Sequence, residues 1–262
     1  MKIMPSKIET ALRYLMVYSL SDILPLYIVN EHPKSGGTWV GQMLGQALDL
    51  PFPRNQLPLL RPSIMHGHYL NPWTMKNVVV VWRDGRDVMV SWYHHSLFEH
   101  TSGRNIAHVK ACRQRLNFQD YENIRENLPK FIEYCFTERQ ESVRFSWGNF
   151  VRQWYQHPEA VFVRYEDLRK QPVVELNRIV RELTGQIIPE KRLQEIVDNF
   201  SFERQSGRLP GQEQKNSFLR KGIVGDWRNN FSKDAGKVFD HYAGDELIML
   251  GYELDKSWIN SI

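Results

Sequence analysis

The stretch HPKSGGTW, residues 32–39, gathers residue types that bind anions, two residues after the apolar residues PLYIV. Gly36 and Gly37 suit a tight turn, and Lys34 adds a positive charge. Ser35 and Thr38 add hydroxyl groups. Where a strand turns into a helix through such a loop, backbone N–H groups and the helix dipole favour an anion. The usual phosphate loop ends in Gly-Lys-Ser or Gly-Lys-Thr, whereas here the lysine precedes the glycines. The stretch predicts an anion site of unusual order, and a tight turn with a surface lysine is the alternative.

Two further groups of basic residues follow later in the chain. Arg83 comes directly after the apolar residues NVVVVW, and Ser91 follows eight positions later. An arginine at a strand end binds a phosphate through two hydrogen bonds, or it pairs with a neighbouring carboxylate of Asp84 or Asp87. The stretch SFLRKGIVGDW contains the second group, Arg220, Lys221 and Gly222. Taken alone, this second group is equally typical of a solvated surface loop.

Apolar stretches alternate with amphipathic ones, which predicts the elements that position these residues. Runs of β-branched and aromatic residues predict buried strands over residues 26–29, 77–82 and 160–168. Helical periodicity predicts helices over residues 38–50, 84–98, 171–185 and 189–200. We expect Asp84 to cap the second helix and Gly185 to end the third. The alternation predicts an α/β fold with a central parallel β-sheet flanked by helices, in which ligands bind at the carboxyl ends of the strands.

The composition is that of a globular chain with a mild positive charge. The chain has 262 residues, of which 42% are hydrophobic and 24% charged, so it can bury a sizeable core. The formal net charge of +4 suits a small anionic ligand. Because the basic residues form discrete loops rather than a stripe, we expect no nucleic-acid partner. We find no internal repeat and predict a single domain, 1–262, with an insertion over about 99–147 that forms a lid or an ordinary helical excursion.

The two cysteines indicate a compartment but no metal site. Cys112 and Cys135 form neither a Cys-x-x-Cys pair nor a disulfide framework, so we expect no metal and a cytoplasmic, reducing location. The first residues lack the apolar core and the cleavage site of a signal peptide. No stretch reaches the 18 apolar residues typical of a membrane span, so none is expected.

The N-terminal segment, residues 1–24, is predicted to be helical. One helical face of this segment consists of Ile8, Leu12, Leu15 and Met16. An apolar face of this kind predicts packing on the core. Contact with a membrane surface is the alternative.

Together these stretches resemble the sulfotransferases that use 3′-phosphoadenosine 5′-phosphosulfate (PAPS). The signatures of that family read approximately PKSGTTW, RNPKDVAVSYYHF and RKGxxGDWKNHF. In the same order this chain reads PKSGGTW, RDGRDVMVSWYHHSLF and RKGIVGDWRNNF, and the resemblance runs from about Tyr27 to Phe231. It implies a single sulfotransferase domain with the phosphate-loop architecture of nucleotide kinases, PAPS as co-substrate, 3′-phosphoadenosine 5′-phosphate (PAP) as product, and no metal.

The resemblance also implies which residues bind the donor. The residues that match the family's phosphosulfate loop are Lys34, Ser35, Gly36, Gly37 and Thr38, followed by Trp39 at the adenine. The residues that match its 3′-phosphate site are Arg83, Ser91, Arg220, Lys221 and Gly222. Tyr165 and Phe202 match positions near the adenine, and the alternative is that each is a core aromatic.

The family's catalytic base is a histidine within a stretch like KTHLP, and this chain reads HGHYL there. This match makes His68 the base, with Lys34 at the leaving phosphate, because a histidine near neutrality can take a hydroxyl proton. His66 then replaces the family's lysine, which helps to bind the sulfonate, and a swap in which His66 is the base stays open. Gly37 is a second departure, because the family usually has a threonine there.

The acceptor is not specified by the sequence. The residues expected on the acceptor side are His66, Tyr69, Trp73 and Tyr93, and they suit a hydroxyl or amine of a phenol, an alcohol, a glycan or a lipid. Two rival functions are a nucleotide kinase, with Mg²⁺ at Glu166 and Asp167, and a non-catalytic nucleotide- or anion-binding module. The oligomeric state also stays open, because RNNFSKDAGK departs from the family's dimer motif, KxxxTVxxxE.

Overall fold

A computed structural model describes most of the chain, namely residues 6–21, 23–24, 26–54, 61–138 and 143–262. Its tertiary contacts form two compact units. Unit 1 consists of Met1–Arg83 and Gln153–Gln205, and unit 2 consists of Asp84–Arg152 and Ser206–Ile262. The expectation of one domain, and of a lid within it, stays a prediction.

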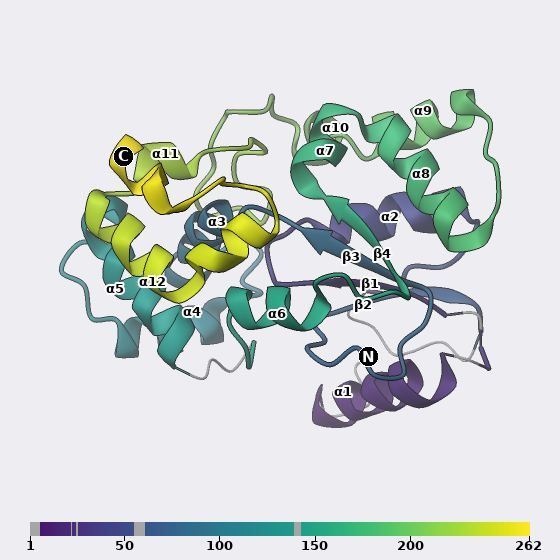
Figure 1. The fold of residues 1–262 in the computed structure, drawn as a ribbon, viewed down its shortest axis with the longest axis horizontal. Helices are drawn as coiled ribbons and strands as arrows, with labels where there is room; N and C mark the ends of the chain where they lie inside the picture. Colours follow the sequence, from purple (N-terminus) through teal and green to yellow (C-terminus); the bar gives the residue numbers. More distant parts are fainter. Residues whose placement is uncertain (1–5, 22, 25, 55–60, 139–142) are drawn as a thin grey trace. The chain divides into compact units, whose positions relative to one another are not determined.

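Unit 1 contains a parallel sheet of four described strands in the order β2-β1-β3-β4 (Figure 1). The strands are β1 (Leu26–Glu31), β2 (Ser63–Gly67), β3 (Val78–Trp82) and β4 (Ala160–Arg164). The α/β fold with a central parallel sheet is therefore confirmed. In the register, Val29 of β1 lies opposite His66 of β2 and Val79 of β3. Because all pairs are parallel, the stretches that follow the strands start from one edge of the sheet.

The sequence analysis missed one strand and extended another. Strand β2 has the sequence SIMHG, which is short and contains only two aliphatic side chains, so neither its length nor its periodicity marks it. Strand β4 ends at Arg164 rather than at residue 168, because helix α7 (Tyr165–Lys170) begins at the next residue.

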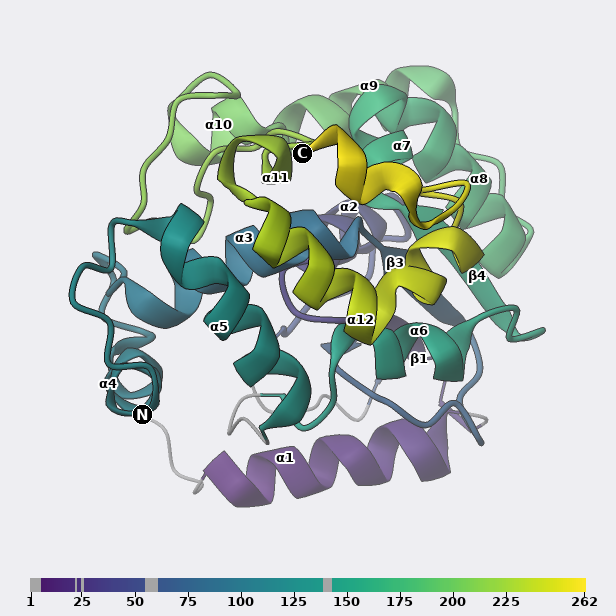
Figure 2. The same cartoon turned by 60° about the vertical axis from the view of Figure 1, so that its left-hand side comes forward.

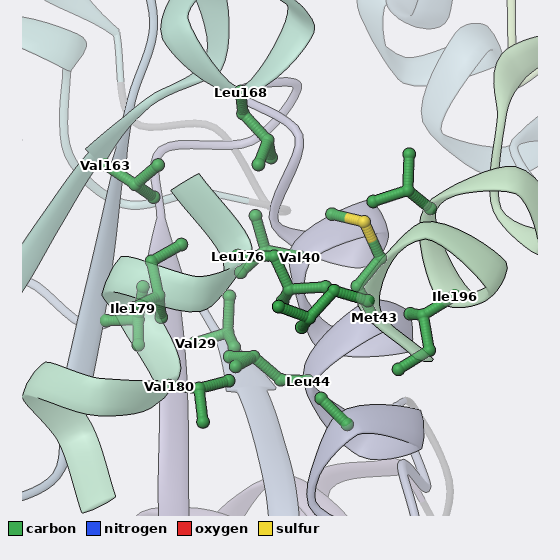
Figure 3. Close-up of a cluster of buried hydrophobic side chains, with 14 of the residues drawn as sticks. Val29, Val40, Met43, Leu44, Val163, Leu168, Leu176, Ile179, Val180 and Ile196 are labelled. Atoms are coloured by element: carbon green, nitrogen blue, oxygen red, sulfur yellow. The ribbon is translucent and has the colours of Figure 1, made fainter. Parts of the chain in front are cut away.

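Three described helices of unit 1 pack on the sheet through one apolar cluster. They are α2 (Gly37–Ala47), α8 (Pro172–Thr184) and α9 (Glu190–Asn199). Figure 3 shows Val29 of the sheet beside Leu44 of α2, and Ile196 of α9 beside Met43 of α2. Each such fully buried aliphatic side chain stabilises the fold by about 1.5–3 kcal/mol relative to an exposed one. Gly185 ends α8 with a φ of 71°, as expected.

The N-terminal segment of unit 1 is helical, but its expected buried face is largely wrong. It consists of α1 (Ser6–Leu15) and a π-helical turn, η1 (Met16–Leu20). Met16 and Val17 are buried, whereas Ile8 and Leu15 are 47% and 55% exposed. A π-turn advances the chain by more residues per turn than an α-helix, which rotates the residues of η1 relative to those of α1. None of the helices in the described part of the chain combines the length and apolar character needed to span a membrane.

Unit 2 is helical in its described part (Figure 2). Its helices are α3 (Gly85–Leu97), α4 (Ile106–Arg115), α5 (Ile124–Thr137), α11 (Trp227–Asn230), α12 (Lys233–Met249) and the 3₁₀ helix η2 (Lys256–Ser261). Two further helices, α6 (Trp147–Trp154) and α10 (Phe202–Ser206), begin in one unit and end in the other. Helix α12 packs on α5 and η2, and α3 packs on α4 and α5. Asp84 caps α3 as expected, because its side chain accepts a hydrogen bond from the Arg86 N–H.

Candidate functional site

The phosphate loop, residues 32–38, connects β1 to the N-terminus of α2 in unit 1. Lys34 and Gly36 have left-handed backbone conformations, with φ of 73° and 105°. Gly36 is required here, because a Cβ at this position would lie only 2.7 Å from Cδ2 of Tyr165. Helix α2 begins at Gly37, and its N-cap residue, Gly36, has no side chain to cap it, so the first turn after Gly37 presents backbone N–H groups and the positive end of the helix dipole. The loop therefore has the backbone shape of an anion site.

Arg83, at the end of β3, contacts the phosphate loop. Its Nη1 donates to the carbonyl oxygen of Lys34 at 2.8 Å, and its guanidinium lies 4.4 Å from the centre of the Tyr165 ring. The Trp39 and Tyr165 rings meet edge to face at 6.1 Å. The indole N–H of Trp39 is buried and has no hydrogen-bond partner among the described residues. Such a hydrogen-bond donor is satisfied when a ligand supplies an acceptor. These contacts bring together four residues of the predicted PAPS site, namely Lys34, Trp39, Arg83 and Tyr165. Phe202 is buried, with 8% of its surface exposed.

Glu31, the last residue of β1, also lies at the phosphate loop, and the sequence analysis did not find it. Its Oε2 accepts a hydrogen bond from the Gly37 N–H at 2.5 Å, and its Oε1 lies 3.0 Å from His66 Nε2. Only 4% of Glu31 is exposed. Burial acts to raise the pKa of Glu31, but the hydrogen bond from His66 and the nearby histidines outweigh it and hold this pKa below its usual value. No sequence signal marked it, because it lies outside the three motifs.

His68 follows β2 and has a defined proton position. Its Nδ1 lies 2.8 Å from the backbone oxygen of Glu31. A carbonyl oxygen only accepts hydrogen bonds, so Nδ1 carries the proton and Nε2 keeps its lone pair. Burial, followed by the charge of His66, lowers the pKa of His68 to about 4, which leaves the ring neutral at neutral pH. The rings of His66 and His68 lie 5.3 Å apart.

The predicted acceptor-side aromatics differ in exposure. Tyr69 is buried in unit 1, where its carbonyl oxygen accepts from Asn30 and from the Trp154 indole at 2.9 and 2.8 Å. Trp73 is 83% exposed. Tyr93 is buried in unit 2, and its hydroxyl group donates to the Tyr121 carbonyl at 2.8 Å.

The basic residues of the third stretch belong to unit 2 and are already paired. The cation cluster, as we call it, consists of Arg220, Lys221, Asp226 and Glu213. Arg220 Nη2 and Lys221 Nζ donate to the two oxygens of Asp226 at 2.5 and 2.6 Å, and Arg220 also pairs with Glu213. Asp226 is 2% exposed. Burial acts to raise its pKa, but the hydrogen bonds from Lys221 and Arg220 outweigh it and lower the pKa of Asp226 to about 2.

Asp87 of α3 holds the backbone next to the cation cluster. Its carboxylate accepts from the N–H groups of Gly225 and Trp227 at 2.7 and 2.9 Å. Gly222 and Gly225 have φ of 65° and 80°, a left-handed conformation that glycine adopts more readily than other residues. Ser91 lies on the same helix as Asp87 and is half-buried. Unit 2 thus contains Ser91 and the third basic stretch, whereas Arg83 belongs to unit 1. Within the described ranges, no group of three or more Asp, Glu, His or Cys side chains has the arrangement of a metal site.

Known proteins share both the sequence pattern and the fold. A family model described as a sulfotransferase domain matches residues 56–251. Sulfotransferase 1A1 of Bos taurus is 26% identical over 88% of this chain and 85% of its own length. Cytosolic sulfotransferase 12 of Arabidopsis thaliana is 36% identical over 82% of this chain and 64% of its own length.

Two crystal structures have a similar fold. The structure of mouse sulfotransferase SULT7A1 complexed with PAP matches with a TM-score of 0.60 and 19% identity over 85% of this chain and 84% of its own. Retinol dehydratase in complex with androsterone and PAP matches with a TM-score of 0.59 and 19% identity over 88% of this chain and 83% of its own.

Proposed function

Because the chain belongs to the sulfotransferase domain family and transfers a sulfuryl group, we propose that its donor is PAPS, with PAP as the product. Lys34, Ser35 and the residues up to Thr38 bind the phosphosulfate, and Trp39 binds the adenine. The residues present fit this donor. The N-terminus of α2 favours an anion, and the buried indole N–H of Trp39 needs an acceptor. The mouse and retinol dehydratase structures that share this fold contain PAP.

The 3′-phosphate site is proposed from the second and third stretches. Its residues are Arg83, Ser91, Arg220, Lys221 and Gly222. The contacts within unit 2 support this assignment, because Asp226 holds the Arg220 and Lys221 side chains in place at 2.5 and 2.6 Å. Cations that are already ordered lose less conformational freedom when they bind a phosphate. Tyr165 and Phe202 are proposed at the adenine.

His68 is the proposed general base, and its hydrogen bond to the Glu31 carbonyl is the observation that carries the mechanism. That bond leaves Nε2 unprotonated and able to accept the proton of the acceptor hydroxyl or amine. His66 is the weaker candidate, since its Nε2 faces the Glu31 carboxylate at 3.0 Å. When bound, PAPS supplies the sulfuryl group: the acceptor oxygen bonds to sulfur, the bond from sulfur to the 5′-phosphate oxygen breaks, and its electron pair leaves with PAP. Lys34 stabilises the charge that develops on that phosphate.

Replacing His68 with alanine tests this proposal. We expect PAP affinity to stay within about threefold of wild type, while the rate of transfer falls about 10²–10⁴-fold, the range of a general base. Transfer is measured by the mass gain of phenols, glycans and lipid alcohols supplied with PAPS. His241→Ala, a change of an exposed histidine on α12, is the control. Near-normal transfer by His68→Ala would remove His68 from this role.

The acceptor site and the location in the cell complete the proposal. We place the acceptor beside His66, Tyr69, Trp73 and Tyr93, with a hydroxyl or amine as the group that is modified. A cytoplasmic location is proposed because the Arabidopsis relative is named as a cytosolic sulfotransferase.

A further inference from the structure

Two departures from the family's pattern meet at one buried carboxylate. Gly37 replaces a threonine and His66 replaces a lysine, and both contact Glu31. A Cβ on residue 37 would lie only 2.7 Å from Cδ of Glu31, so a threonine would fit there only if this carboxylate moved. The Glu31 carboxylate accepts a hydrogen bond from the Gly37 N–H at 2.5 Å. At position 37 the family has a hydroxyl-bearing side chain, whereas this chain has none. The departures at positions 37 and 66 are therefore linked through Glu31.

The Glu31 carboxylate requires a positive partner. It is nearly fully buried, and a buried ionised carboxylate without an opposite charge is strongly unfavourable. His66 Nε2, at 3.0 Å, provides its side-chain hydrogen bond. The groups that face His66 are Glu31 from β1, His68 after β2 and the Phe52 ring, 6.3 Å away, while the charge of Arg54 acts on neighbouring His68. Of these groups, Glu31 carries the negative charge.

We propose that Glu31 is a positioning residue that orients His66 and keeps it doubly protonated, so that an imidazolium at position 66 takes over the task of the family's lysine beside the sulfonate. This inference rests on the proposed function, since it assigns a charge to a group on the donor side. Glu31 itself does not touch the donor in this role. It acts through His66 and through the N–H group of Gly37.

An imidazolium differs from a lysine in how easily it loses its proton. A lysine stays charged up to a pH of about 10, whereas a histidine titrates within a few units of neutrality. Once His66 is neutral, the Glu31 charge is compensated only by the Gly37 N–H and the dipole of α2, and it repels the anionic donor more strongly. Donor binding must therefore weaken as the pH rises, whereas a lysine at position 66 would keep it constant.

Two measurements test the charge of His66 without relying on turnover. Long-range ¹H–¹⁵N spectra of the imidazole rings should show both His66 nitrogens protonated at about pH 7 in the wild type and one in Glu31→Gln. Calorimetric titration with PAP should show an affinity loss of about tenfold or more between pH 6 and 9 in the wild type. His66→Lys should keep its affinity within about threefold over this range, and Glu31→Gln should move the loss to lower pH.

The control removes another buried carboxylate that has no link to the donor. Glu246, on α12 in unit 2, is 3% exposed and pairs with Arg152. Glu246→Gln should leave the pH dependence of PAP affinity unchanged. If Glu31→Gln does not fold, the wild-type spectra and His66→Lys still decide the question.

The outcomes separate this inference from the proposed function. A wild-type protein that binds PAP with a singly protonated His66 at about pH 7 would overturn the inference alone. An affinity loss in His66→Lys as steep as in the wild type would do the same. A wild-type protein that binds no PAP and transfers nothing from PAPS would overturn the proposed donor.

Discussion

The phosphate loop of unit 1 and the cation cluster of unit 2 each hold a buried carboxylate against groups expected to bind anions. In the phosphate loop, Glu31 accepts from a backbone N–H and faces His66. In the cation cluster, Asp226 accepts from Arg220 and Lys221. The two carboxylates are similarly buried, at 4% and 2% exposure, so burial does not distinguish them. They differ in the chemistry of their partners.

This difference determines how each region responds to pH. Arginine and lysine stay charged throughout the physiological range, so the charge balance at Asp226 is fixed there. The partners of Glu31 are an imidazole, that of His66, and the backbone N–H of Gly37. The two regions therefore hold their buried carboxylates with different chemistry, permanent cations in one and an imidazole with a backbone N–H in the other.

The largest effect is expected when Asp226 of the cation cluster loses its charge. Asp226→Asn should lower the free energy of unfolding by about 3 kcal/mol at about pH 7, because Lys221 loses its carboxylate partner and Arg220 keeps only Glu213. The wild-type pKa of Asp226 falls from 3.8 to about 2 on folding, so the stability it contributes is present above 3.8 and is lost as the pH falls through about 2. The difference between wild type and variant in urea unfolding should therefore shrink over this acidic range.

A second aspartate in unit 2 provides the matched control. Asp234 on α12 pairs with Lys237 at 3.4 Å, but its side chain is 78% exposed. Asp234→Asn should change the free energy of unfolding by less than about 0.5 kcal/mol, since exposed ion pairs contribute little. Equal losses in the two variants would show that the burial of Asp226 does not matter.

Much of the fold was predictable because most of its strands are continuous apolar runs in the sequence. The four consecutive valines of β3 and the apolar run of β1 predict buried parallel strands, and Asp84 and Gly185 mark helix boundaries through their capping chemistry. Strand β2 was missed because its pairing with β1 supplies the stability that its own residues do not indicate. The exposed positions of Ile8 and Leu15 were missed because periodicity shows that a helical face is apolar, not what covers it.

The site was predictable residue by residue only where signatures exist. The placement of Lys34, Trp39, Arg83 and Tyr165 around one loop agrees with the motif, although the roles of these residues stay predictions. Glu31 was not predictable, because its importance arises from two contacts, to residues six and 35 positions away. A departure such as Gly37 reads as a missing hydroxyl group in the sequence, and only the packing shows that a carboxylate fills the space.

A smaller effect is expected when the space between Glu31 and Gly37 is filled. Gly37→Ala should lower the free energy of unfolding by about 2 kcal/mol, because the new Cβ overlaps the Glu31 carboxylate and forces it to move. In the background of Glu31→Ala the same change should cost less than about 0.5 kcal/mol, since the overlap is gone. The double-mutant cycle is measured by urea unfolding, and additive losses would contradict the link between positions 31 and 37.

Gly148 on α6 is the control for the glycine itself. A Cβ there would make ordinary contacts of 3.4 Å or more. Gly148→Ala should therefore be neutral or stabilise the protein by up to about 1 kcal/mol, because alanine favours helix more than glycine does. A loss equal to that of Gly37→Ala would mean that helical glycines are generally required in this protein.

The smallest effect concerns a neutral histidine next to the cation cluster. Burial, followed by the charges of Arg220 and Lys215, lowers the pKa of His94 to about 3. The folded protein keeps this ring neutral while the unfolded chain takes up a proton near pH 6.5, so stability is present above 6.5 and is lost as the pH falls toward 3. When the pH falls from about 7 to 5.5, the free energy of unfolding should decrease by about 1 kcal/mol more in the wild type than in His94→Gln. Urea unfolding of both proteins at the two pH values measures this difference of differences, in which any pH-independent effect of the substitution cancels. An undiminished loss in the variant would mean that His94 is protonated in the folded state, and the cation cluster would then contain an adjustable charge after all.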